Sequence, residues 1–285
     1  MDRADIVHGN FLARLGAQDL PNGPRPTGTL SPEMARVAFR AACTSRALDL
    51  TARQMQREGQ GFYTIGSSGH EALASVALAF RTSDMAFLHY RDAAFQLARA
   101  DQAGHVSPEW DMLLSFAASA EDPISGGRHK VLGSRALMIP PQTSTISSHL
   151  PKAVGAAYSV AAAKRHTPEH QVMPNDAVVM ASFGDASANH STAQGAFNAA
   201  AWTAYQNIPL PLVFVCEDNG IGIRSAAQGT KRSPLSLREP VRTVDCGTLS
   251  HILSGNRPHT WAKVSPQKPV QGKPVISKKP IKSTP

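Results

Sequence analysis

The stretch that decides the fold is "DAVVMASFGDASANHSTAQGAFNAAAWTAYQNIPLPLVFVCEDNG", residues 176–220. Its two apolar runs, 176–183 and 211–217, have the length of strands, and the Ala-rich segment 191–206 between them has the length of a helix. Continuous apolar strands that are separated by a helix indicate a parallel sheet with both faces covered. We therefore expect an α/β fold, in which a parallel sheet carries helices on both faces.

The chain before this stretch predicts more helices. A long helix should begin with Ser31 as N-cap and Pro32 at the first helical position, and Gly59 should end it. The segment 121–149 contains Gly, Pro, Ser and Thr without a period, so we expect a long loop, and such loops are more often functional than idle. The remaining expected elements are helices at 68–80, 91–101 and 150–166 and a short extended segment at 85–90.

Composition divides the chain into three parts. Residues 1–30 are rich in Pro and Gly and are expected to form an N-terminal arm, and residues 31–223 should form the folded domain. Residues 224–285 hold 12 of the 29 Lys and Arg residues and 2 of the 21 acidic ones, so the net charge of +8 belongs to this segment. Its Lys, Pro and Ser residues show little periodicity, which predicts a disordered basic tail. A nucleic-acid-binding protein that acts through this tail is the alternative from another class, with the single aromatic Trp261 for stacking.

Other general features favour a cytoplasmic protein. The three cysteines are widely spaced and odd in number, which predicts neither a disulfide framework nor a metal site. The N-terminal residues lack the apolar core of a signal peptide. No apolar run approaches the ~20 residues that span a bilayer, so we expect no membrane segment.

Polar side chains follow both strands of the opening stretch. Asp185 follows the first strand and Asn219 the second, and a right-handed crossover places both at one edge of the sheet, where open α/β sheets bind ligands. Carboxylate and amide oxygens suit Mg²⁺, which completes its shell with phosphates and water. Gly184 and the backbone N–H groups of Ala186 and Ser187 would form an anion-binding helix start. In the alternative interpretation Asp185 only caps the next helix and Asn219 belongs to an ordinary turn.

A phenol and a guanidinium lie at the start of the helix predicted at 91–101. Tyr90 and Arg91 are suited to hold diphosphate oxygens, because a guanidinium can donate two parallel hydrogen bonds. The alternative is a surface arginine that is paired with Asp92 or Asp84.

Four segments in order carry a resemblance to a known family: "GFYTIGSSGHEA" (61–72), "HYRDAAF" (89–95), "GSRALMIPPQTSTISSHLPKAVGAAYS" (133–159) and the motif from Gly184 to Asn219. Together they resemble the alpha subunit of the thiamine-diphosphate-dependent 2-oxo acid dehydrogenases, the decarboxylating first component of those complexes. The segment "STISSHLPKAVGAAYS" is more similar to the branched-chain 2-oxoisovalerate type than to the pyruvate type. The resemblance implies a thiamine-diphosphate-binding fold over about residues 31–223.

The resemblance also implies a set of roles for the site residues. Asp185, Asn219 and the backbone carbonyl of Ile221 match the Mg²⁺ ligands, and Tyr90 and Arg91 match the pair that binds the diphosphate. Ser144 and Ile146 match positions at the aminopyrimidine ring of the cofactor. The cofactor-binding residues are therefore expected to be Tyr90, Arg91, Ser144, Ile146, Gly184, Asp185, Ala186, Ser187 and Asn219.

Three histidines lie in the resembling segments. His129 lies where the family places a histidine beside the substrate and is the candidate catalytic residue, and an exposed loop histidine is the alternative. His149 is expected behind the site, near the start of a helix, and His70 is expected to pack. Two residues depart from the family motif, Ala186 at its second glycine and Asp218 at its first asparagine.

The family activity is oxidative decarboxylation of a 2-oxo acid, with acyl transfer to a lipoyl group. It implies a beta-type subunit and a lipoyl-bearing acyltransferase as partners. Residues 224–285 do not resemble the family's continuation after "NGIGI", so the alternative is a truncated or frame-shifted fragment that does not catalyse.

Overall fold

The computed structural model of this chain describes residues 3–19, 31–67, 69–104, 107–166 and 168–217. The predicted basic tail, Asn219 and Ile221 lie outside these described residues. In their part of the chain, the structure confirms an α/β fold that is built on a parallel sheet.

The main sheet has the strand order β1-β4-β5, and all its strands are parallel. These strands are β1 (Ala86–Phe87), β4 (Val179–Gly184) and β5 (Leu212–Glu217). Ala86 pairs with Met180, and β4 stays in register with β5 from Val179↔Leu212 to Gly184↔Glu217. The carboxyl ends of the three strands therefore lie at one edge.

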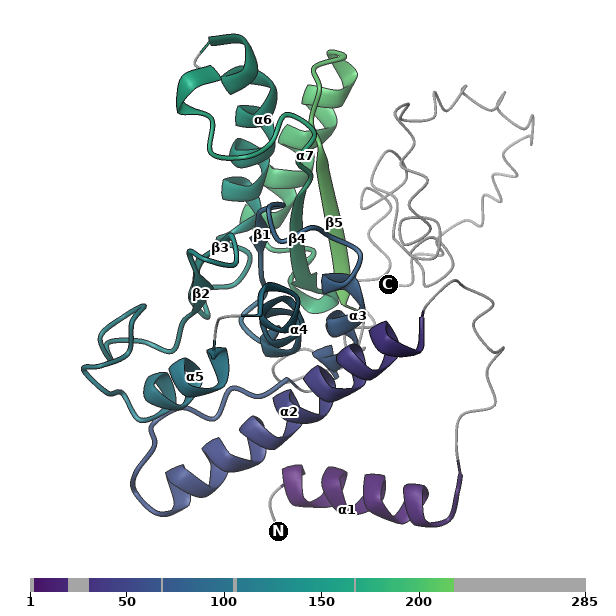
Figure 1. The fold of residues 1–285 in the computed structure, drawn as a ribbon, viewed down its shortest axis with the longest axis vertical. Helices are drawn as coiled ribbons and strands as arrows, with labels where there is room; N and C mark the ends of the chain where they lie inside the picture. The colour runs from purple at the N-terminus through teal and green to yellow at the C-terminus, as the bar shows by residue number, and fades with distance from the viewer. Residues whose placement is uncertain (1–2, 20–30, 68, 105–106, 167, 218–285) are drawn as a thin grey trace, which may run out of the picture.

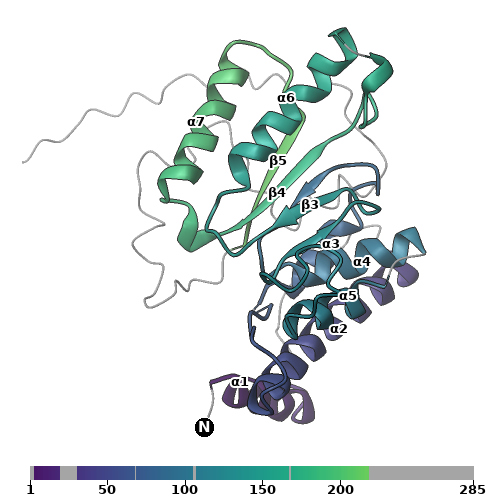
Figure 2. The ribbon, with the colours of Figure 1, turned by 90° about the vertical axis from the view of Figure 1, so that its left-hand side faces the viewer.

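Helices cover both faces of this sheet, as expected. Val179, Ala181 and Phe183 turn to one face and pack with α6 (Leu150–His166) and α7 (Ser191–Tyr205). Met180 turns to the other face and packs with residues of α2 (Pro32–Arg57), α3 (Leu73–Ala77) and α4 (Ala93–Ala103). Figures 1 and 2 show α6 and α7 on one side of the strands and α2, α3 and α4 on the other.

The long helix α2 has the ends that its sequence predicts. The Ser31 side chain accepts a hydrogen bond from the Met34 N–H at 3.2 Å, Pro32 follows it, and Gly59 has φ 73° just after the helix.

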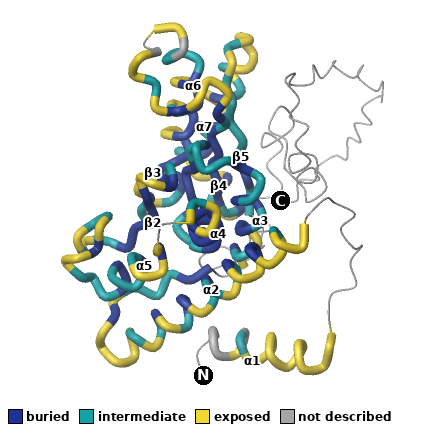
Figure 3. Tube along the Cα trace, in the orientation of Figure 1, coloured by how far each residue is buried: buried dark blue, intermediate teal, exposed yellow. Residues whose placement is uncertain are grey.

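Upstream, the predicted arm contains α1 (Arg3–Gly16), which is largely exposed (Figure 3). Further down the chain, α5 (Pro108–Phe116) lies next to α4 and α2.

Two expectations about the elements are wrong. The segment 121–149 is not one irregular loop, because β2 (Leu132–Ser134) and β3 (Ile139–Gln142) pair antiparallel within it. The helix expected at 68–80 consists of the 3₁₀ turn η1 (His70–Ala72) and the short α3, which ends at Ala77. The remaining 3₁₀ turns are η2 (Pro168–His170) and η3 (Asp185–Ser187).

A buried arginine fixes α4 against the strands. Arg99 is 0% exposed, and its Nη1 donates to the carbonyl of Asp84 at 2.8 Å and to that of Leu137 at 3.0 Å. Burial lowers the pKa of Arg99 to about 10, which leaves it charged at neutral pH. One side chain thus joins α4 to the segment before β1 and to the β2–β3 hairpin, so the start of α4 has a defined place at the sheet edge.

Phe183 offers a direct test of the core behind this edge. Its ring is 1% exposed and lies 5.2 Å from that of Phe197 and 6.4 Å from that of Phe214. We expect Phe183→Ala to lower the free energy of unfolding by about 3–5 kcal/mol, because it removes a buried aromatic ring and leaves a cavity. Phe39→Ala, at a ring that is 72% exposed, should change it by less than about 0.5 kcal/mol. Urea unfolding of both variants measures the two values, and equal losses would contradict the packing.

Candidate active site

Three segments of the chain meet at the carboxyl edge of the sheet. Residues 89–92 follow β1, Asp185 follows β4, and Glu217 is the last residue of β5. Gly184 pairs with Glu217, so Asp185 lies beside the point where β5 leaves the sheet. Asn219 and Ile221 lie outside the described residues, and their contact with Asp185 stays a prediction.

Asp185 is buried, with 6% of its surface exposed, and opens the turn η3. It does not cap α7, because the N-cap of that helix is His190, whose Nδ1 accepts a hydrogen bond from the Thr192 N–H at 3.3 Å. The helix-cap alternative is therefore wrong.

The residues around Asp185 form a short turn rather than the start of a long helix. Ala186 and Ser187 lie in η3, and α7 begins only at Ser191. The Ser187 hydroxyl donates to the Gly184 carbonyl at 2.7 Å. The backbone N–H groups of Ala186 and Ser187 thus belong to a tight turn at the sheet edge and do not open α7.

Tyr90 and Arg91 lie half-buried between β1 and α4. The Arg91 guanidinium lies over the Tyr90 ring, 5.2 Å from its centre, and its Nη1 donates to the Gly66 carbonyl at 2.7 Å. At Gly66 a Cβ would come within 2.0 Å of the Asp49 carboxyl group, so a larger residue there would require the Asp49 side chain to move.

The alternative expectation for Arg91 was a surface ion pair with Asp92 or Asp84, but Arg91 instead donates to the Gly66 carbonyl. Asp84 instead pairs with Arg81 at 3.2 Å, and Asp92 points into the interior. Arg91 is therefore held by a backbone carbonyl at the sheet edge.

The loop residues predicted to meet the cofactor also come together. His129 Nε2 and Ser144 Oγ lie 3.3 Å apart, and the half-buried His129 ring meets Tyr63 edge-on. Ile146 is half-buried in the same loop, two residues beyond Ser144. Next to it, Ser147 has φ 58°, is 1% exposed, and donates its hydroxyl to the Ser187 carbonyl at 3.5 Å. This contact ties the loop to η3 and hence to the turn that holds Asp185.

Beneath these residues lies a buried polar network that the sequence did not suggest. Asp92 is 0% exposed, and its Oδ1 accepts a hydrogen bond from His70 Nδ1 at 3.1 Å. Its Oδ2 accepts from the His89 backbone N–H at 2.8 Å and from the Ser182 hydroxyl. Burial would raise the pKa of Asp92, but the hydrogen bond and charge of His70 outweigh it and lower this pKa. Asp92 is therefore a buried carboxylate that joins η1, the end of β1 and the middle of β4.

His70 carries the positive charge that balances Asp92. Its Nδ1 also lies 2.9 Å from Glu217 Oε2. Burial alone would lower the pKa of His70, but the hydrogen bonds to Asp92 and Glu217 outweigh it and raise this pKa to about 10. His70 is buried and stacks on the His89 ring, which agrees with the expected packing role, but it also holds a charge in this network. Burial and the charge of Asp92 raise the pKa of Glu217 well above its ordinary value.

Three more buried bases surround this network, and burial lowers the pKa of each. The pKa of His89 falls to about 3 and that of Lys130 to about 7, the latter helped by the nearby Arg91 charge. Lys130 Nζ donates to the Tyr90 carbonyl at 2.7 Å. The pKa of His149 is also lowered, and its Nε2 lies 2.6 Å from the Ser182 carbonyl. His149 is thus placed behind the site at the start of α6, as expected.

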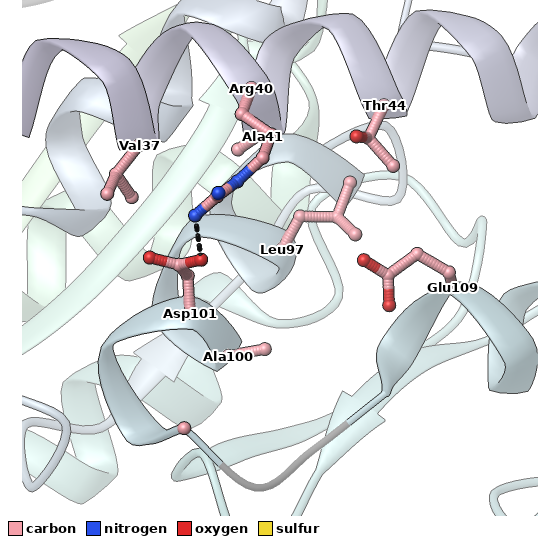
Figure 4. Close-up of a pocket in the computed structure, with 9 residues that line it drawn as sticks. Val37, Arg40, Ala41, Thr44, Leu97, Ala100, Asp101 and Glu109 are labelled. Carbon is pink, nitrogen blue, oxygen red and sulfur yellow. Dashed lines mark hydrogen bonds and ion pairs between the residues drawn. The ribbon is translucent and has the colours of Figure 1, made fainter.

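A surface hollow between α2, α4 and α5 is a separate feature (Figure 4). The Arg40–Asp101 ion pair crosses it, with Glu109 at its rim. It lies at the carboxyl end of α4, whereas Arg91 and Asp92 precede the amino end of that 11-residue helix. At 1.5 Å per residue the two ends are about 16 Å apart. The hollow therefore does not belong to the site at the sheet edge.

The parallel sheet and the polar residues at its carboxyl edge define an α/β protein with a ligand site outside its strand ends. A sequence model of the dehydrogenase E1 component family matches residues 39–238, well over half of the chain. The chain belongs to the dehydrogenase E1 component family, and the expected thiamine-diphosphate-binding fold is confirmed.

Several curated proteins are similar to the chain. The 2-oxoisovalerate dehydrogenase subunit alpha of Bacillus subtilis is 30% identical over 190 residues, which cover 65% of this chain and 51% of that protein. The mitochondrial subunits of the same name from mouse and human are each 26% identical, over 187 and 231 residues that cover 38% and 44% of those proteins. The chain thus spans about half, or less, of the length of these relatives. Within its described residues, no helix is long and apolar enough to cross a membrane.

The charge on His70 can be tested through its effect on stability. The pKa of His70 is about 10 in the folded chain and near its ordinary 6.5 when unfolded. The stabilisation is therefore complete below about pH 6.5 and lost as the pH rises through about 10. We expect the stability advantage of the wild type over His70→Gln to shrink between pH 7 and 10. Urea unfolding at each pH, with a chelator present, measures this advantage.

His170, an exposed histidine on η2, provides the control. His170→Gln should have the same free energy of unfolding as the wild type at every pH. A constant difference between the wild type and His70→Gln across this range would mean that His70 is neutral.

Proposed function

We propose that this chain is the alpha-type part of a thiamine-diphosphate-dependent 2-oxo acid dehydrogenase, which decarboxylates its substrate and passes the acyl group to lipoamide. The observation that carries this proposal is that Arg91, Asp185 and the Ser144 loop lie at the same edge of the sheet, in a chain that matches the E1 component family. The names of the relatives favour branched-chain 2-oxo acids as substrates.

The residues at this edge fit thiamine diphosphate with magnesium. A guanidinium has five N–H donors, and the bond from Nη1 to Gly66 uses only one of them. Arg91 can therefore also hold diphosphate oxygens. Asp185 offers a buried carboxylate, the oxygen ligand that Mg²⁺ prefers, and Asn219 and Ile221 are proposed to complete the set. When bound, thiamine diphosphate supplies the electron sink for decarboxylation.

The other residues have supporting tasks in this proposal. Tyr90 stacks against Arg91 and holds its direction, and the buried Asp92 fixes the start of α4 from which both project. The Ser144 loop, with Ile146, would meet the aminopyrimidine ring. His129, which is 3.3 Å from Ser144, would hold or move a proton beside the substrate.

The assembly is also a proposal. Because the relatives are alpha subunits and the chain spans about half of their length, we propose a beta-type subunit and a lipoyl-bearing acyltransferase as its partners. A cytoplasmic location stays a prediction.

Isothermal titration calorimetry tests the cofactor proposal. We expect thiamine diphosphate to bind in the presence of Mg²⁺, to the chain alone or together with a beta-type subunit, and to bind weakly without the ion. Asp185→Asn should weaken binding at least about tenfold, because an amide replaces the negative charge of a magnesium ligand. Arg91→Met should do the same by removing a charged donor to the diphosphate.

Asp19→Asn is the matched control, at an exposed carboxylate that pairs with Arg14 on the surface. It should bind like the wild type. If no binding occurs with or without the beta-type subunit, or if all three variants bind equally, the proposal is wrong.

A further inference from the structure

The buried cluster of His70, His89, Asp92 and Glu217 has the composition of a metal site. One ligand atom from each side chain lies within 4.8 Å of the others. The four residues come from η1, the end of β1, the residue before α4 and the end of β5. They are distinct from Asp185, Asn219 and Ile221, the proposed magnesium ligands. The cluster is thus a second group of converging donors at the same sheet edge.

The distances in this cluster suit a small cation. His70 Nδ1 lies 2.9 Å from Glu217 Oε2 and 3.1 Å from Asp92 Oδ1, and His89 Nδ1 lies 4.0 Å from Asp92 Oδ1. A tetrahedral ion with ligands at about 2.0–2.2 Å separates its ligand atoms by about 3.3–3.6 Å. The three separations given above, 2.9 to 4.0 Å, lie on both sides of this range, and all four ligand atoms lie within 4.8 Å of one another. The stacked rings of His70 and His89, with centres 4.8 Å apart, already lie side by side.

A second observation is that one carboxylate oxygen of the cluster has no hydrogen-bond partner among the described residues. The Glu217 side chain is 10% exposed, and its Oε1 is buried without a hydrogen bond in the described part of the chain. A buried carboxylate oxygen without a hydrogen bond costs folding free energy, and binding of a cation or a proton would remove this cost. Once His70 has lost its proton, as a metal ligand must, the two carboxylates and two imidazoles carry a charge of −2, which one divalent ion neutralises.

The ligand types decide which ion fits. Magnesium prefers six oxygen ligands and keeps water, whereas two imidazole nitrogens and two carboxylate oxygens match zinc and similar first-row ions. We propose that His70, His89, Asp92 and Glu217 bind one zinc-type divalent ion, which ties β5 to η1 and to the start of α4 beneath the edge of the sheet.

In the metal-bound state, the ion takes the place of the proton between His70 and the two carboxylates. Zinc binding would then release that proton, and both His70 Nδ1 contacts would become contacts through the metal. The ion would hold the end of β5 in place. Because Asn219 follows Glu217 by two residues, this site would also fix the direction in which the chain enters the proposed magnesium site.

The test uses the full chain after removal of metals with a chelator, and the probe is Zn²⁺ alone. Equilibrium dialysis followed by elemental analysis should find one Zn²⁺ per chain, and a large excess of Mg²⁺ should not displace it. Co²⁺ in place of Zn²⁺ should give the intense visible absorption of a tetrahedral ion. Zn²⁺ should raise the midpoint of thermal unfolding, since it binds the folded state.

Variants separate this site from other metal contacts. His70→Gln and Glu217→Gln should each weaken Zn²⁺ binding by at least about tenfold and remove the Co²⁺ spectrum, since even outer partners of metal ligands have effects of this size. His170→Gln, at an exposed histidine, should have no effect. Asp185→Asn should also leave Zn²⁺ binding unchanged, whatever it does to thiamine diphosphate. Circular dichroism confirms that each variant is folded.

Three results would overturn the proposal. Folded wild-type protein that binds no Zn²⁺ would show that the cluster is an ion-pair network around a protonated His70. Zn²⁺ binding that survives both His70→Gln and Glu217→Gln would place the ion on surface groups. Loss of Zn²⁺ in Asp185→Asn would assign the ion to the proposed magnesium site.

Discussion

The buried carboxylate of Asp92 is the constraint on which the site depends. A carboxylate with 0% exposure is tolerated only when charge and hydrogen bonds compensate it. Two of its partners, His70 and Ser182, lie 22 and 90 positions away in the sequence, and the third is the nearby backbone N–H of His89. Satisfying Asp92 therefore requires η1, the end of β1 and the middle of β4 to meet in one arrangement. Tyr90 and Arg91 immediately precede Asp92, so the same network places their side chains at the sheet edge.

The electrostatics of this edge combine opposite requirements. An anionic diphosphate needs positive charge, whereas Asp92 and Asp185 bring negative charge to the same ends of the strands. The positive charge comes from His70 and Arg91, while burial lowers the pKa of Lys130 to about 7. Their hydrogen bonds to Asp92, Gly66 and Tyr90 hold these groups in fixed positions beside the acidic ones.

The elements that the sequence could predict are those with local signals. Ser31, Pro32 and Gly59 mark the ends of α2, and the apolar runs around Phe183 and Phe214 mark buried parallel strands. The β2–β3 hairpin was missed, because its second strand reads "IPPQ" and prolines argue against a strand.

The buried network was missed for a different reason. Its bonds join residues 22 and 90 positions apart, such as Asp92 to His70 and to Ser182, and no local pattern reports such pairings. The two signals that the sequence held were Ser182, a polar residue within an apolar strand, and Glu217 at the end of the next one. Either would have indicated a polar site on that face of the sheet. The role of His129 was predicted from the family resemblance. Its contact with Ser144 could not be predicted, because it depends on how the loop between them folds.

The central claim is that the edge organised by Asp92 binds a diphosphate through Arg91 and a metal ion through Asp185. A crystal structure of the chain with thiamine diphosphate and Mg²⁺, in the presence of a beta-type subunit where it is needed, tests this most directly. The predicted result is diphosphate within hydrogen-bond distance of the Arg91 guanidinium, with the ion coordinated by Asp185 and Asn219. Cofactor that is bound elsewhere, with Asp185 coordinating no ion, would contradict it.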